Sequence, residues 1–114
     1  MGLSDRHLAD HGTKDARRLS KLELEADDYY FSPTFLRGTP GQKLALLVES
    51  EASTLHNISI PALGIDQDVA PKGKVQVNVT FPASGALAFF CKFHGPLGMN
   101  GQLLTGDSGS GSTR

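Results

Sequence analysis

Three side chains that can bind a soft metal ion lie within nine residues near the end of the sequence. Cys91, His94 and Met99 supply a thiol, an imidazole and a thioether. A thiolate and a thioether together with imidazole favour copper over zinc, and two histidines with one cysteine and a long axial methionine form the copper centres that transfer electrons. The segment therefore contains most of a copper site and lacks only a second histidine.

The second histidine is expected from His56, which lies in an earlier segment with the pattern of a strand. His56, Ile58 and Ile60 occupy alternate positions. Alternate side chains of a strand share one face, so His56 is predicted to point toward the apolar side while Asn57 and Ser59 point away. This is where a buried metal ligand is expected.

Each of these residues has an ordinary explanation when it is taken alone. A single cysteine on an apolar strand is usually a small buried hydrophobic residue. A histidine after a strand is more often solvated or hydrogen-bonded than bound to a metal, and a methionine after a glycine is usually packed or exposed. Their joint order and spacing in a small all-β chain favour the copper interpretation.

The pattern of His56-Asn57 followed by Cys-x2-His-x4-Met resembles the plastocyanin and azurin type of cupredoxin. The spacing from Cys91 to Met99 is similar to that of plastocyanin, whereas azurin has more residues between cysteine and histidine. The resemblance implies a mononuclear type 1 (blue) copper site with one copper ion per chain. The implied ligands are His56, Cys91, His94 and Met99.

The resemblance also implies a function and a way of docking. The protein is expected to shuttle single electrons between redox partners by Cu(I)/Cu(II) cycling, with Asn57 bracing the two ligand segments through hydrogen bonds. His94 is expected to present an edge to solvent within an apolar patch, where redox proteins dock transiently. The candidates for this patch are Gly95, Pro96 and Leu97, together with Pro61, Ala62 and Leu63.

Length and composition limit the other possibilities. A chain of 114 residues forms one domain, and its net charge of -1 predicts no nucleic-acid binding. No apolar stretch is long enough to span a bilayer. The single cysteine allows neither an internal disulfide nor a binuclear copper centre with two bridging cysteines.

Short segments of period two predict an all-β Greek-key sandwich of seven or eight strands, similar to a cupredoxin. Residues 1–18 are predicted to be a polar, flexible leader, residues 19–105 the domain, and residues 106–114 a Gly/Ser-rich tail. His7 and His11 lie in the leader, where a helix would place them on one face to catch a metal adventitiously. Residues 61–73 are predicted to be a long loop between sheets, and Phe35 to pack beneath the sandwich.

Three rival functions remain open at this point. A copper carrier or storage protein would hold Cu(I) with the same ligands. An enzyme would use Cys91 as nucleophile with His94 or His56 as base, but the sequence indicates no oxyanion-hole motif, no third orienting residue and no small-molecule substrate. A metal-free binding module would be expected to lack at least one ligand, and none is missing.

The expected location is extracytoplasmic, either periplasmic or at the outer side of a membrane. Residues 1–7 are polar where a secretory signal has an apolar run. Either the protein is cytoplasmic, or a signal or membrane anchor is missing from the present sequence. We expect the second, because the resembling family works mostly outside the cytoplasm.

Overall fold

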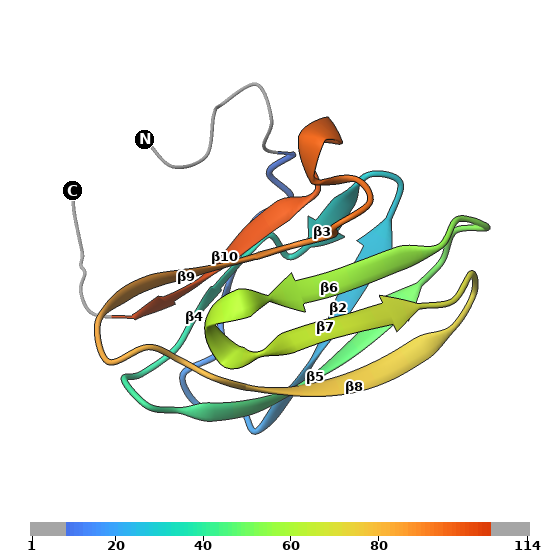
Figure 1. Cartoon of the computed structure of the whole chain (residues 1–114). Coiled ribbons are helices and arrows are strands. Elements are labelled where there is room, and N and C mark those ends of the chain that lie inside the picture. The colour runs from blue at the N-terminus through green and yellow to red at the C-terminus, as the bar shows by residue number, and fades with distance from the viewer. Residues whose placement is uncertain (1–8, 106–114) are drawn as a thin grey trace.

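The computed structural model describes residues 9–105, which form two β-sheets packed face to face (Figure 1). The six-stranded sheet has the order β1-β4-β10-β9-β6-β7, and the four-stranded sheet has the order β3-β2-β5-β8. The strands are β1 (Thr13–Asp15), β2 (Lys21–Asp27), β3 (Tyr30–Ser32), β4 (Phe35–Arg37), β5 (Lys43–Ser50), β6 (His56–Ile60), β7 (Ile65–Val69), β8 (Lys74–Thr80), β9 (Gly85–Phe90) and β10 (Asn100–Thr105). Two 3₁₀ turns, η2 (Pro61–Leu63) and η3 (Gly95–Leu97), lie in the connections. None of the helical segments in this part of the chain has the length and apolarity needed to cross a membrane.

The pairing of β6 with β9 brings two distant segments to one end of the larger sheet. These strands are antiparallel neighbours, with Ser59 opposite Phe90. The first residue of β6 therefore lies beside the chain that leaves β9. This register places His56 next to Cys91, although 35 positions separate them in the sequence.

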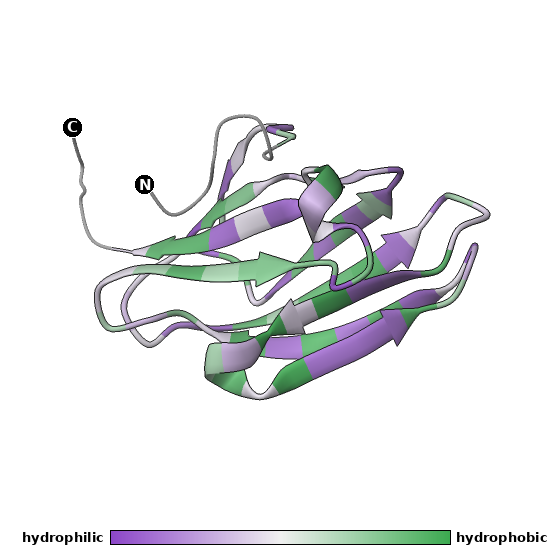
Figure 2. Ribbon diagram, turned by 45° about the horizontal axis from the view of Figure 1, so that its top comes forward, coloured by the Kyte–Doolittle hydropathy of each residue, from purple (hydrophilic) through white to green (hydrophobic). Residues whose placement is uncertain are grey.

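The core lies between the two sheets, because hydrophobic and hydrophilic residues alternate along the strands (Figure 2). Alternation directs every second side chain to the inner face of its sheet. Phe31 from the smaller sheet meets Phe89 from the larger one, edge to face at 5.1 Å between ring centroids. The predicted all-β sandwich with a cupredoxin-like fold is confirmed, and it contains ten strands among the described residues.

The structure contains three strands that the sequence pattern did not predict. Two of them are β1 and β4. β1 runs parallel to β4, and β4 runs parallel to β10. Leu36 is the completely buried residue of β4, whereas Phe35 is only half-buried. Strands of three residues show no clear alternation, so the periodicity of the sequence did not reveal them.

The packed part of the chain begins before residue 19, which corrects the predicted leader over residues 1–18. β1 belongs to the larger sheet, and Ala16 is fully buried in the core. His11 is exposed, and its ring stacks on Tyr30 at 3.6 Å between centroids. Backbone pairing holds this segment without many apolar side chains, which explains its polar composition. His7 and the tail over residues 106–114 lie outside the described residues.

The predicted loop over residues 61–73 contains the third unexpected strand. β7 pairs with β6 in the antiparallel direction and extends the larger sheet by one edge strand. Its middle residues are exposed, since an edge strand of this kind faces solvent. Asp66 and Asp68 gave the segment the composition of a loop, although the chain crosses to the other sheet only after Val69.

Gly101 is predicted to be essential for the packing of β10 against β9. A Cβ atom at this position would overlap the Phe89 ring and the Thr34 carbonyl oxygen. We expect Gly101→Ala to lower the free energy of unfolding by about 1–3 kcal/mol, measured by denaturant unfolding of the metal-free protein. Gly95→Ala is the control, because its Cβ would meet only Asn100 Oδ1 at 3.5 Å. Equal stability of the two variants would contradict the prediction.

Candidate metal centre

The loop from Cys91 to Met99 is closed by hydrogen bonds between its own backbone groups. The Cys91 N–H donates to the Met99 carbonyl at 3.1 Å. The N–H groups of His94 and Gly95 donate to the Cys91 carbonyl at 3.1 and 2.7 Å. The loop therefore has a defined shape that does not depend on a bound ion.

The 3₁₀ turn η3 occupies the middle of this loop and ends at a glycine. Pro96 lies in the first turn, where its fixed φ angle fits and its missing N–H has no cost. Gly98 has a φ angle of 106° and donates its N–H to the Gly95 carbonyl at 2.9 Å. Residues with a Cβ resist that angle, so the glycine allows the chain to turn back toward β10.

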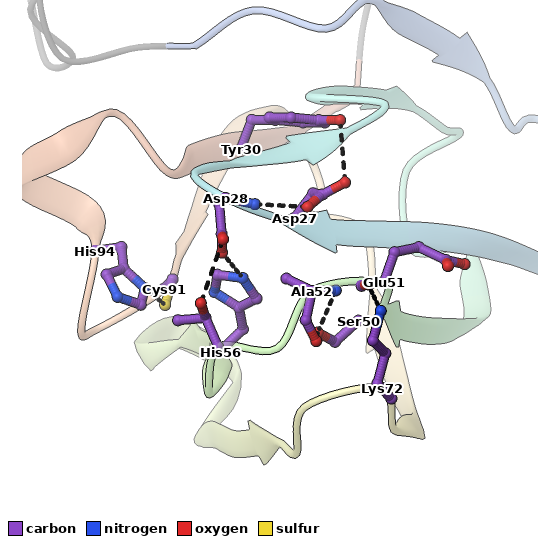
Figure 3. Close-up of polar contacts among 11 residues, drawn as sticks. Asp27, Asp28, Tyr30, Ser50, Glu51, Ala52, His56, Lys72, Cys91 and His94 are labelled. Carbon is purple, nitrogen blue, oxygen red and sulfur yellow. Dashed lines mark hydrogen bonds and ion pairs between the residues drawn. The ribbon is translucent and has the colours of Figure 1, made fainter.

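His56, Cys91 and His94 converge at the end of the sandwich, as predicted (Figure 3). One donor atom from each residue lies within 4.8 Å of the others. Cys91 Sγ is 3.4 Å from His94 Nδ1, and the two imidazole rings are 5.1 Å apart between centroids. His56 and Cys91 are completely buried and His94 is partly exposed. Two imidazoles and a thiol thus surround one point beneath the surface.

The contacts of His56 show that this point suits a cation. His56 Nε2 is 2.9 Å from Asp28 Oδ1, and a carboxylate partner places the ring proton on Nε2. His56 Nδ1 is buried without a hydrogen-bond partner, alone among the buried side-chain nitrogens and oxygens of residues 9–105. Burial lowers the pKa of the imidazole, although the bond to Asp28 opposes this shift. A neutral imidazole whose unprotonated nitrogen has no hydrogen-bond partner can bind a metal ion through that nitrogen.

Met99 is buried in the same loop as Cys91 and His94. Its side chain is completely inaccessible to solvent. Its backbone N–H donates to the His94 carbonyl at 3.3 Å, and its carbonyl accepts from Cys91. The backbone therefore fixes Met99 against both loop ligands, and the axial bond to copper stays a prediction.

Comparison with known proteins identifies the family. The sequence model of the cupredoxin-like domain matches residues 7–104. This chain belongs to the cupredoxin-like domain family. No curated protein sequence matches it.

Three solved structures share the cupredoxin fold with this chain. The metal-binding domain of the Cu(I)-exporting P-type ATPase CopA from Streptococcus pneumoniae D39 has a TM-score of 0.67 at 12% identity, covering 87% of this chain and 100% of that one. Auracyanin A, a blue copper protein from Chloroflexus aurantiacus, has a TM-score of 0.64 at 18% identity, covering 83% and 100%. Auracyanin from Roseiflexus castenholzii has a TM-score of 0.60 at 18% identity, covering 76% and 97%. At these identities the likeness establishes the fold alone.

Asn57 connects the two ligand segments of this cupredoxin by hydrogen bonds. Its Oδ1 accepts from the Lys92 backbone N–H at 3.3 Å. Its Nδ2 donates to the carboxylates of Asp66 and Asp68 at 2.8 and 2.9 Å. Asn57 points away from the core as predicted, but β7 and its aspartates bury it completely. The expected brace between β6 and the Cys91 loop is therefore present.

The turn between β2 and β3 contributes two residues to the site that sequence reasoning did not find. Asp28 bonds to His56, and the Tyr29 ring packs against the His94 ring at 4.7 Å between centroids. No spacing or motif links this turn to the ligand residues, because the contact forms between the two sheets.

Part of the apolar patch predicted around His94 lies elsewhere. Pro96 and Leu97 are exposed in η3 beside His94, as expected. The turn η2 (Pro61–Leu63) follows the last residue of β6, so it lies at the opposite end of that strand from His56 (Figure 1). Tyr29, Leu55 and Phe93 take its place as exposed large hydrophobic residues near the site.

The lowered pKa of His56 predicts that the metal-free protein loses stability in mild acid. Unfolded His56 binds a proton near the ordinary value of 6.5, whereas native His56 resists protonation to lower pH. The unfolded state then holds more protons, so the free energy of unfolding falls as the pH falls below about 6.5. His56→Gln should flatten this dependence in denaturant titrations between pH 5 and pH 8. An unchanged slope in His56→Gln would contradict the assignment.

Proposed function

We propose that this cupredoxin is a mononuclear type 1 copper protein that shuttles single electrons between redox partners. The observation that carries the proposal is the convergence of a bare buried nitrogen of His56 with Cys91 Sγ and a nitrogen of His94. Soft sulfur combined with imidazole favours copper. Met99, buried in the same loop, is proposed as the weak axial ligand.

The surroundings of the ligands support electron transfer rather than simple metal storage. A bound copper ion would supply the one-electron chemistry by alternating between Cu(I) and Cu(II). Asp28 holds His56, and the closed backbone of the loop holds Cys91 and His94. Ligands that are fixed before the metal binds move little when its charge changes. Little rearrangement makes each electron transfer fast.

The exposed apolar residues near His94 support docking of partner proteins at this end. The exposed large hydrophobic residues among the described ones are Tyr29, Leu55, Phe93 and Leu97, and Leu97 is the most exposed at 62%. Each is part of a segment that carries a proposed ligand or contacts one. Interfaces of redox proteins are small and short-lived. An apolar patch over a partly exposed ligand suits such brief contacts.

A copper carrier is the second candidate function. The structure of the CopA metal-binding domain was determined with Cu(I), and its fold is similar to that of this chain. A carrier would use the same ligands but would release copper readily to a chelator or an acceptor protein. Reversible redox cycling with slow release of copper would favour electron transfer.

The structure opposes the alternative in which Cys91 is an enzymatic nucleophile. Asp28 does supply the orienting carboxylate that the sequence pattern lacked. Cys91, however, has no exposed surface. A nucleophile must reach its substrate, so complete burial of the sulfur opposes this role.

The proposed location outside the cytoplasm rests on the family resemblance. Electron carriers of this type serve partners in the periplasm or at a membrane surface. Fractionation of the native host cells, followed by detection of the protein, would test this proposal. Recovery with the cytoplasmic proteins would contradict it.

Addition of Cu(II) to the metal-free protein is the direct test of the copper function. We expect an intense thiolate-to-copper charge-transfer band and a narrow copper hyperfine splitting in electron paramagnetic resonance. One equivalent of copper per chain should saturate both signals. Weak colour with ordinary square-planar parameters would contradict a type 1 site.

Two variants assign the ligands in the same experiment. Cys91→Ser should abolish the intense band, since the band requires the thiolate. Met99→Leu should keep copper bound but shift the reduction potential, because only the weak axial bond changes. A coloured Cys91→Ser protein would overturn the ligand assignment.

The docking surface can be tested without an identified partner by measuring electron self-exchange. We expect Leu97→Glu to slow exchange between the Cu(I) and Cu(II) forms several-fold in NMR line-broadening experiments, because two added charges would repel across the contact. Ser84→Glu is the control, since this exposed residue precedes β9, at the opposite end of the strand from Cys91. Equal rates in both variants would contradict docking at the patch.

A further inference from the structure

The His56 imidazole depends on a carboxylate that comes from the other sheet. Asp28 lies in the turn between β2 and β3, and its Oδ1 is 2.9 Å from His56 Nε2. Its second oxygen accepts a hydrogen bond from Thr54 Oγ1 at 3.2 Å. Both carboxylate oxygens therefore contact the chain at or just before the start of β6.

The turn that carries this carboxylate is itself held in place. Asp27 Oδ1 accepts the Asp28 backbone N–H at 2.8 Å, and the Tyr30 hydroxyl donates to Asp27 Oδ2 at 3.3 Å. Tyr29 packs its ring on His94 at 4.7 Å between centroids. Consecutive residues of one turn thus contact the two histidines of the site, and Figure 3 shows Asp28 directed at the His56 ring.

We propose that Asp28 is a positioning residue of the copper centre, which fixes His56 with Nδ1 directed to the metal and stabilises Cu(II) relative to Cu(I). This inference rests on the proposed copper function. A carboxylate on the outer nitrogen selects one tautomer of a ligating histidine and raises its basicity. Its negative charge favours the more positive ion. The Asp28 side chain is 38% exposed, so solvent weakens this charge effect without removing the hydrogen bond.

Two variants separate the hydrogen bond from the charge. Asp28→Asn can still accept from Nε2 but carries no charge, so the copper protein should keep its charge-transfer band. Its preference for Cu(I) should rise about tenfold, equal to an increase of about 59 mV in reduction potential. Asp28→Ala loses both effects, and we expect its Cu(II) affinity to fall about 10- to 100-fold.

Glu51→Gln is the charge-matched control for the potential. Glu51 is an exposed carboxylate in the connection between β5 and β6, and it does not bond to a ligand residue. Its removal should change the potential much less than Asp28→Asn. An equal change would mean a general effect of charge and would overturn the role assigned to Asp28.

A measurement on the metal-free protein tests the positioning independently of copper. Nitrogen-15 NMR of the histidine rings should show His56 with its proton on Nε2 in the wild type and in Asp28→Asn, and a mixture of tautomers in Asp28→Ala. A single unchanged tautomer in Asp28→Ala would overturn the inference. Failure of the wild type to form a charge-transfer band would instead overturn the copper function itself. A normal band with an unchanged potential in Asp28→Asn would overturn only the electrostatic role of Asp28.

Discussion

The candidate metal centre depends on one buried imidazole, His56, whose two nitrogens have different surroundings. His56 has no exposed surface, so each of its nitrogens needs a partner within the protein or a ligand. Asp28 satisfies Nε2 from the opposite sheet, whereas Nδ1 is left bare beside Cys91 and His94. Leaving a buried polar atom without a partner costs free energy that a bound cation would recover. The site is therefore built for an ion before any ion binds.

The remaining ligands depend on a loop that is shaped by its own backbone. Hydrogen bonds from Cys91, His94 and Gly95 close the loop, and Asn57 ties it to the adjacent strand β6. These contacts use either backbone atoms of the proposed ligands or the side chain of Asn57, which lies outside the proposed ligand set. The backbone and Asn57 thus hold the loop in place, so the side chains of Cys91 and His94 remain available to bind an ion. This division explains how small changes in the surrounding residues can tune a centre without destroying it.

The residues of the candidate centre differ in their exposure to solvent. Cys91 and His56 are completely buried, so neither solvent nor a substrate reaches the sulfur. His94 is partly exposed among apolar side chains, and Tyr29 covers one side of its ring. Under the proposed function, an electron would pass through this edge when a partner docks, whereas a substrate would not reach the buried sulfur. This arrangement supports the proposed transfer between proteins rather than chemistry on a small molecule.

The sequence by itself determined which residues could bind copper and which kind of fold would hold them. The order His56, Cys91, His94 and Met99 predicted a copper site, and the period-two pattern predicted seven strands of a sandwich. The pattern did not reveal β1, β4 and β7, because two of these strands have only three residues and the third is a polar edge. Tertiary structure alone decided that Asp28 and Tyr29 meet the two histidines. Periodicity encodes which face of a strand is buried, but a contact between turns of different sheets arises only when the sheets pack together.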